Sequence, residues 1–103
     1  MGNIISGKGG GSAQPVMGRV AMGRKVEPGD VLVAKMTDPA MFADMQRAIA
    51  VVTDEGGAFC HAAIVCNQMG TPFVVGTKVA TTTLKDGMFV KVDPAKGTVE
   101  VLG

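Results

Sequence analysis

The sequence is poor in aromatic residues: it contains four phenylalanines and neither tryptophan nor tyrosine. Aliphatic and methionine side chains must therefore supply most of a core, and they dominate a hydrophobic content of 47%. A chain of 103 residues is long enough for one domain with a single modest core. We therefore expect one compact domain.

Excess charge and long apolar runs are also missing. Ten basic and nine acidic residues give a net charge of +1, and no basic run alternates with aromatic residues as in a nucleic-acid-binding surface. No apolar run approaches the roughly 20 residues of a membrane-spanning helix. The N-terminus has no charged and then apolar leader. We expect neither nucleic acid nor a membrane as a partner, and the cytoplasm as the location.

Cysteine and histidine are scarce, with Cys60, Cys66 and the single His61. The two cysteines lie six residues apart on a predicted helix and point to different faces, so we expect free thiols in a reducing compartment. The three side chains lack the number and spacing of a closed zinc site, and we expect no metal. A Cys60 nucleophile with His61 as base is also disfavoured, because adjacent residues seldom reach each other in the required geometry.

Glycine is abundant, and the first eleven residues contain five of the fifteen. The run Ser6-Gly-Lys-Gly-Gly10 resembles the start of a nucleotide-binding P-loop, but no second Gly-Lys-Ser/Thr and no helical pattern follow it. We therefore predict a flexible glycine-rich arm over residues 1–14 and the folded domain over residues 15–103.

The apolar pattern predicts alternating strands and helices. We expect strands over 16–22, 31–34, 48–52 and 73–76, a helix capped by Thr37 or Asp38 over 39–47, and a second helix from Cys60 or His61 to about Gly70. Residues 78–83 are expected as a short connector or strand, and 88–92 and 98–102 as a hairpin. The strand, helix and strand over 48–76 predict a parallel β-α-β unit with a site at the carboxyl end of its first strand.

His61 lies where that site is expected, at the start of the second helix. Neutral imidazole is a good nucleophile near pH 7, and free amide groups at a helix N-terminus can receive phosphoryl oxygens. Gly56 and Gly57 allow the preceding loop to come close, and the small Ala62 leaves the approach open. Two interpretations follow from spacing alone: a phosphoryl carrier, or a structural histidine that is bonded to a neighbouring carbonyl.

Three stretches resemble the phosphohistidine domain of phosphoenolpyruvate-utilising enzymes, which include phosphoenolpyruvate synthase, pyruvate phosphate dikinase and enzyme I of the sugar phosphotransferase system. They are Thr-Asp-Glu-Gly-Gly-x-x-Cys-His-Ala-Ala-Ile-Val at 53–65, Met-Gly-Thr-Pro-Phe-Val-Val-Gly at 69–76, and Val-Leu-Val-Ala-Lys-Met-Thr-Asp-Pro at 31–39. The resemblance runs from about Pro15 to Gly103. It implies an α/β fold of the β/β/α swivelling type, with a parallel β-α-β core and a C-terminal hairpin.

The resemblance also implies a function. His61 matches the histidine that is transiently phosphorylated, on Nε2 in the family, and carries phosphate between active sites. The residues expected to support the phosphate are Gly56, Gly57, Cys60, Thr53 and Ala62. The domain itself is expected to bind no cofactor. Mg²⁺ with ATP or phosphoenolpyruvate is expected on partners in trans, an ATP-grasp protein or domain and a TIM barrel that binds phosphoenolpyruvate or pyruvate. The chain is then a phosphotransferase component, not a complete enzyme.

The sequence departs from the family at Ala58 and Phe59, where many members have Arg-Thr or Met-Thr. Those side chains help to hold phosphoryl oxygens, whereas Phe59 offers an apolar docking contact. This difference keeps open a non-catalytic regulatory or interaction module with the same fold.

The neighbouring polar residues are open to more than one role. Thr53 and Asp54 fit either contacts to a phosphoryl group or ordinary turn formation. Thr37 and Asp38 are expected as helix caps. Glu55 is expected to point into solvent, because its charge would repel a phosphoryl group.

Overall fold

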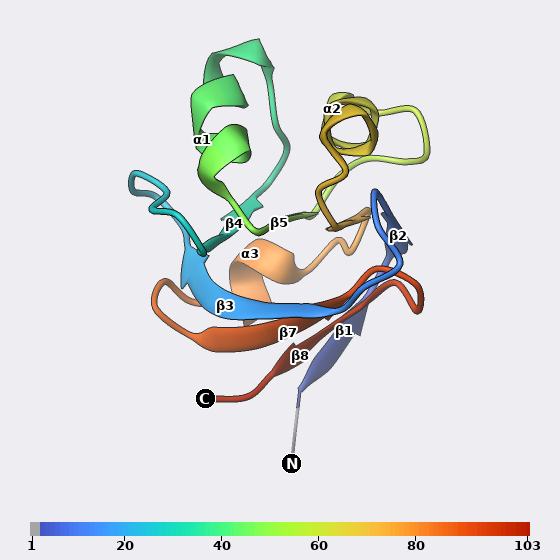
Figure 1. Cartoon of the computed structure of the whole chain (residues 1–103). Coiled ribbons are helices and arrows are strands. Elements are labelled where there is room, and N and C mark those ends of the chain that lie inside the picture. The colour runs from blue at the N-terminus through green and yellow to red at the C-terminus, as the bar shows by residue number, and fades with distance from the viewer. Residues whose placement is uncertain (1–2) are drawn as a thin grey trace.

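The computed structural model describes residues 3–103 and shows a sheet with short helices (Figure 1). The strands are β1 (Ile4–Ser6), β2 (Lys8–Gly10), β3 (Val16–Ala21), β4 (Val31–Ala34), β5 (Ala50–Thr53), β6 (Phe73–Val75), β7 (Phe89–Asp93) and β8 (Thr98–Val101). The helices are α1 (Phe42–Arg47), which a 3-10 turn over Pro39–Met41 precedes, α2 (His61–Met69) and α3 (Ala80–Thr83).

The elements form three layers. The strand order is β1-β8-β7-β3-β4-β5-β6-β2, in which β3, β4, β5 and β6 pair in parallel and the other pairs are antiparallel. Helices α1 and α2 cover β4 and β5 from one side, and β3, β7, β8 and β1 form a second sheet on the other side, with β3 joining the two sheets (Figure 1). The predicted β/β/α fold is confirmed, with its parallel β-α-β unit and C-terminal hairpin.

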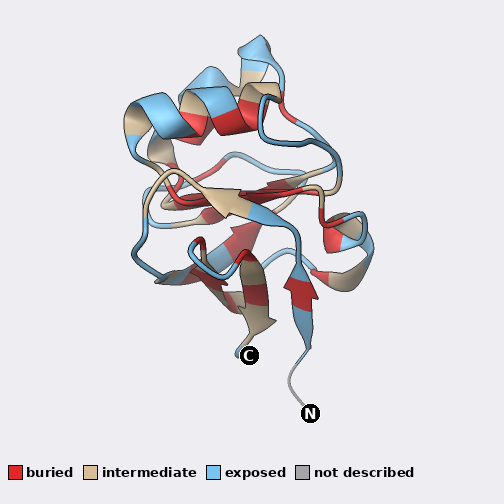
Figure 2. Cartoon of the chain, turned by 90° about the vertical axis from the view of Figure 1, so that its right-hand side faces the viewer, coloured by how far each residue is buried: buried red, intermediate tan, exposed pale blue. Residues whose placement is uncertain are grey.

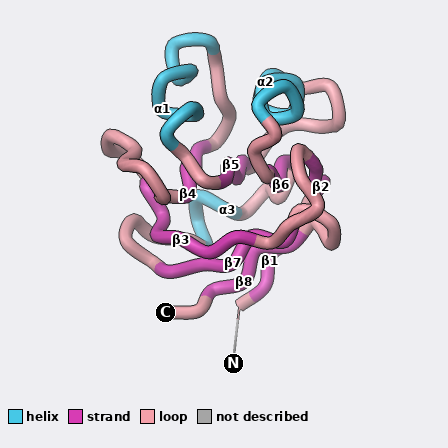
Figure 3. The backbone as a smooth tube through the Cα atoms, viewed as in Figure 1, coloured by secondary structure: helices cyan, strands magenta, loops and turns pink. Residues whose placement is uncertain are grey.

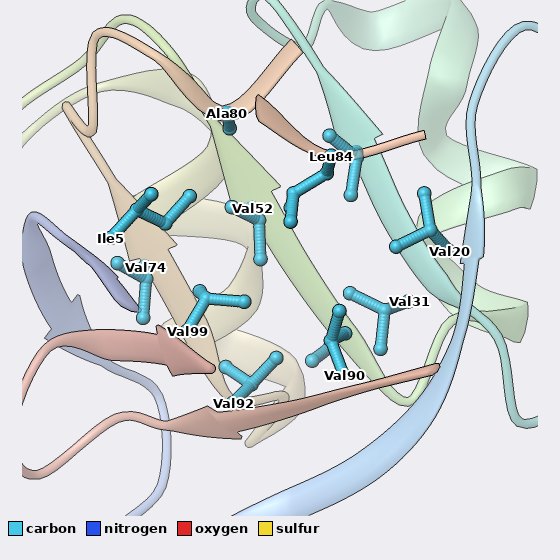
Figure 4. Packing of buried hydrophobic residues seen from close by; sticks show 12 residues of the cluster. Ile5, Val20, Val31, Val52, Val74, Ala80, Leu84, Val90, Val92 and Val99 are labelled. Atoms are coloured by element: carbon cyan, nitrogen blue, oxygen red, sulfur yellow. The ribbon is translucent and has the colours of Figure 1, made fainter. Parts of the chain in front are cut away.

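Alternation along the parallel strands builds two cores, because successive side chains of a strand point to opposite faces. Val31, Val33 and Val52 belong to the core between the two sheets, whereas Leu32 and Val51 belong to the core below the helices. Figure 4 shows side chains of both sheets meeting in the first core. Figure 2 shows that the helices bury the side that faces the sheet. Within the strand expected over 48–52, residues 50–52 are buried on both faces of the sheet, as a short continuous apolar run indicates.

The helix predicted over residues 39–47 is present, and its start is capped by Asp38, whose carboxylate accepts the Ala40 N–H at 2.9 Å. Residues 78–83, expected as a short connector or strand, connect β6 to β7, and residues 80–83 within them form α3. Its amides are capped by Thr77 Oγ1, which accepts the Ala80 N–H at 3.1 Å, and by the Asp54 carboxylate, which accepts the Thr81 N–H at 2.8 Å. Figure 3 shows α3 apart from α1 and α2, on the other side of β4 and β5.

The prediction of a flexible arm over residues 1–14 is wrong for residues 4–10; residues 1 and 2 lie outside the described part. Strand β1 pairs with β8, strand β2 pairs with β6, and Ile5 is buried in the core between the sheets. The glycines allow close approach: a Cβ at Gly9 would lie 2.0 Å from the Pro94 carbonyl oxygen. Since Gly7 alone separates β1 from β2, the two ends of the sheet are joined through one segment.

Candidate functional site

A pocket of about 150 Å³ lies where the loops after β4 and β5 meet the first turn of α2. Parallel strands place their carboxyl ends at one edge of a sheet, which brings these two loops together. The lining residues are Met36, Thr37, Thr53, Glu55, Gly56, Cys60, His61 and Ala62. The pocket therefore lies at the predicted carboxyl end of β5 and also at the end of β4.

His61 is the first residue of α2, and its half-buried ring lines the pocket. Its Nδ1 lies 2.8 Å from Oγ1 of Thr37, a buried residue of the loop after β4. Among residues 3–103, no hydrogen-bond partner is found for Nε2. One ring nitrogen is thus fixed by the protein, and the other is free to meet a ligand.

Thr37 was missed as a site residue. The sequence predicts Thr37 or Asp38 as a helix cap; Asp38 takes that role, and Thr37 turns to His61. One signal could have identified Thr37. It follows β4, the parallel neighbour of β5, and the loops after parallel strands meet at one edge of the sheet.

Cys60 caps α2, and its Sγ accepts the Ala63 N–H at 3.5 Å. Ile64 N–H donates to the Cys60 carbonyl at 3.0 Å. Among the described residues, the first-turn amides left without an acceptor are those of His61 and Ala62. A helix N-terminus with free amides attracts an anion.

The two glycines of the loop differ in what they provide. Gly56 has φ +120°, and a Cβ there would lie 2.7 Å from Cys60 Sγ. At Gly57 nothing lies within 4 Å of an added Cβ. Gly56 is therefore the residue that lets the loop lie against the helix start, whereas Gly57 leaves open space.

Thr53 and Ala62 line the pocket from its buried side. The Thr53 hydroxyl donates to the Glu55 carbonyl at 2.6 Å, and its own carbonyl accepts the Thr77 hydroxyl at 2.9 Å. Ala62 packs into the core below the helices. Asp54 caps α3 through Thr81, which fits its turn-forming interpretation. The Thr53 hydroxyl is therefore engaged in shaping the loop.

Charge at the pocket is contributed by Glu55, the one acidic lining residue. Its side chain is 52% exposed, in agreement with the expected solvent-facing position, and its Oε2 lies 3.7 Å from Nζ of Lys35. No lysine or arginine is among the described lining residues. Next to the pocket, the side chain of Phe59 is 88% exposed.

The two cysteines are free and differ in their surroundings. Cys60 is half-buried, whereas Cys66 is fully buried within α2. This burial raises the pKa of the Cys66 thiol to about 12, with a smaller contribution from the charge of Cys60.

Within residues 3–103 no group of three or more His, Cys, Asp or Glu side chains is placed to hold a metal ion. No helix in the described part of the chain is long and apolar enough to cross a bilayer.

Comparison with known proteins gives a consistent picture. Residues 26–97 match the family model of the PEP-utilising enzyme, mobile domain. A probable phosphoenolpyruvate synthase of Archaeoglobus fulgidus is 64% identical over 75 residues, which are 73% of this chain and 10% of that protein. A phosphoenolpyruvate synthase of Pseudomonas aeruginosa is 46% identical over 96 residues, which are 93% of this chain and 12% of that protein. The chain thus spans about a tenth of the length of these relatives.

A solved structure agrees with this match. The solution NMR structure of Enzyme I (nEIt) superposes with a TM-score of 0.62 at 31% identity, covering 77% of this chain and 32% of that one. The similarity therefore extends to the arrangement of the backbone.

Proposed function

The chain belongs to the mobile-domain family of phosphoenolpyruvate-utilising enzymes, and from this membership we propose that it is a phosphoryl carrier in which His61 is transiently phosphorylated. The observation that carries the proposal is the geometry of His61. Its Nδ1 is held by Thr37, and its Nε2 has no partner among the described residues beside a pocket of about 150 Å³.

In this proposal the Thr37 hydroxyl accepts the Nδ1 proton of His61, which makes Nε2 the reacting nitrogen. When Nδ1–H donates to Thr37 Oγ1, the lone pair of the neutral ring lies on Nε2. That lone pair attacks phosphorus in line, a P–O bond to the donor's leaving group breaks, and the ring keeps its Nδ1 proton. The phosphoryl oxygens then lie near the free amides of His61 and Ala62. Return of the group to an acceptor reverses these steps.

The relatives are much longer than this chain, which supports partners that supply the remaining chemistry. We propose an ATP-grasp protein or domain as one partner and a TIM barrel that binds phosphoenolpyruvate or pyruvate as the other, each with Mg²⁺. The domain itself then contributes the nucleophile and its orientation. The proposed setting is the cytoplasm, where two free thiols remain reduced.

The alternative function is a non-catalytic interaction module, and one observation favours it. Phe59 exposes 88% of its side chain next to the pocket, as expected of a residue that a partner covers. A module of this kind uses the exposed surface and does not need the nucleophile.

Intact-mass measurement separates the two functions. The domain is incubated with Mg²⁺ and a phosphoenolpyruvate synthase from which the mobile domain has been removed. The phosphoryl donor is phosphoenolpyruvate in one reaction and ATP in the other. The carrier gains one phosphoryl group that is stable in alkali and labile in acid, and His61→Ala gains none. An unmodified wild-type domain under both conditions contradicts the proposal.

A further inference from the structure

Phosphorylation of His61 creates an unbalanced charge in the pocket. The phosphoryl group is dianionic near neutral pH, and Glu55 already contributes a carboxylate to the pocket wall. No described lining residue is a lysine or arginine. Like charges a few ångströms apart repel each other strongly where water is partly excluded. A cation at the edge of the pocket would offset this repulsion and add to the free amides of His61 and Ala62.

Lys35 is placed to supply this cation. Its Nζ lies 3.7 Å from Glu55 Oε2, and its backbone carbonyl accepts the Glu55 N–H at 2.9 Å, so the two residues are held side by side. Lys35 directly precedes Met36 and Thr37, both of which line the pocket, and Thr37 contacts the histidine. The lysine thus lies at the pocket rim, on the same loop that orients the ring.

Two arginines form ion pairs away from the pocket. Arg24 forms ion pairs with Asp30 and Asp86, and Arg47 forms one with Asp44. Lys35, in contrast, forms its ion pair with Glu55, a carboxylate that lines the pocket. This distinguishes it from Arg24 and Arg47, whose carboxylate partners do not line the pocket.

The Lys35–Glu55 pair is suited to exchange. The two side chains are 73% and 52% exposed, and such exposed pairs contribute about 0–1 kcal/mol. A dianion offers the ammonium group a stronger partner than a single carboxylate does. Little stability is lost when the lysine leaves Glu55, so the exchange is favourable once a phosphoryl group is present.

We propose that Lys35 holds the phosphoryl group on His61, leaving Glu55 when the histidine is phosphorylated and returning to it when the group departs. This inference rests on the proposed carrier function and adds to it the cation that makes the phosphorylated state favourable. In the resting state the same pair neutralises Glu55, so the carboxylate does not repel an incoming donor.

The test uses phosphoramidate, a small donor that needs no partner. Nε2 of His61 forms the new N–P bond, the P–N bond of phosphoramidate breaks, and ammonia leaves with the proton that the donor nitrogen already carries. Phosphorylation is followed by intact mass for wild type, Lys35→Met, Lys35→Arg and Glu55→Gln. Lys85→Met is the matched control, since Lys85 is an exposed lysine outside the pocket.

We expect Lys35→Met to be phosphorylated about tenfold more slowly, which corresponds to about 1.4 kcal/mol. We expect Lys35→Arg and Lys85→Met to remain close to wild type, and Glu55→Gln to react faster. A second readout is the ³¹P titration of the phosphorylated domain. Loss of the neighbouring ammonium raises the pKa of the phosphoryl group in Lys35→Met, an effect that a purely structural role would not produce.

Two results overturn the proposal in distinguishable ways. If wild type is phosphorylated on His61 and Lys35→Met matches it in both rate and ³¹P titration, Lys35 is not the cation and the carrier function stands. If wild type itself stays unmodified at His61 with phosphoramidate and with the partner enzyme, the carrier function fails and the role of Lys35 fails with it.

Discussion

Thr37 Oγ1 and His61 Nδ1 lie 2.8 Å apart, although the two residues are separated by 24 positions in the sequence. One belongs to the loop after β4 and the other begins the helix after β5, so the contact depends on the parallel pairing of these strands. The buried hydroxyl determines which way the half-buried ring faces. The imidazole of His61 is thereby held in one orientation at the pocket.

Thr37→Val is expected to remove this orientation while keeping the shape of the side chain. The ring loses one hydrogen bond, so we expect a stability decrease of about 0.5–1.5 kcal/mol and a slower reaction of Nε2 with phosphoramidate. The ¹⁵N chemical shifts of the ring report its tautomer and should show Nδ1–H in wild type and a mixture in the variant. Thr37→Ser keeps the hydroxyl and serves as the control. Unchanged ring shifts in Thr37→Val would show that the contact does not select the tautomer.

Gly56→Ala should destabilise the domain by about 1–3 kcal/mol, because φ +120° is unfavourable for alanine and the new Cβ would lie 2.7 Å from Cys60 Sγ. Gly57→Ala is the matched control, since nothing lies within 4 Å of a Cβ there. Urea unfolding of both variants measures the difference. Equal stabilities would contradict the distinction between the two glycines.

The two thiols should differ in reactivity. Burial raises the pKa of Cys66 to about 12, so this thiol stays protonated at pH 8, whereas the half-buried Cys60 lies beside the pocket. Iodoacetamide should add one label to the folded protein, at Cys60, and two labels in urea. Peptide mapping by mass spectrometry locates the label, and rapid native labelling of Cys66 would disprove its burial.

The raised pKa of the Cys66 thiol should also make the domain less stable in alkali. The unfolded thiol has the ordinary pKa of 9.0 and the folded thiol about 12, so the folded state binds more protons between these values. This contribution is fully present below pH 9 and decreases as the pH rises toward 12. Cys66→Ala lacks the group, and its urea midpoint should change less between pH 8 and pH 10 than that of wild type.

The lowered pKa of Asp86 should make the stability of the domain fall in acid. The Met22 N–H, which donates to its carboxylate at 3.0 Å, and the Arg24 guanidinium lower the pKa of Asp86 below the ordinary 3.8. The contribution is present above that ordinary value and is lost as the pH falls through the lower folded value. The urea midpoint of Asp86→Asn should therefore depend less on pH below 4 than that of wild type. Glu27→Gln is the control and should follow wild type, because the Glu27 side chain forms no ion pair with Arg24.

Much of this architecture follows from local patterns. Short continuous apolar runs predict the strands Val31–Ala34 and Ala50–Thr53, and such a run is typical of a strand that is buried on both faces. The Gly-Gly-x-x-Cys-His sequence predicts the loop and helix start that place His61. These features are local because a strand face or a helix cap is determined by residues a few positions apart.

The missed features depend on distant contacts. Thr37 has the composition of a helix cap, and only the pairing of β4 with β5 brings it to the histidine. The glycines of residues 7–11 have the composition of a linker, but they permit close contact with residues that follow by 60 or more positions. Residues 78–83 are predicted as a connector or a strand, whereas the distant carboxylate of Asp54 caps residues 80–83 as a helix.

The single glycine between β1 and β2 has a consequence for association between chains. Residues 4–6 pair with β8 and residues 8–10 pair with β6, so one short segment occupies both outer strands of the sheet. Exposed strand edges are templates for aggregation. Proteolytic removal of this segment would uncover the edges of β8 and β6 at once, and such edges favour edge-to-edge association between chains.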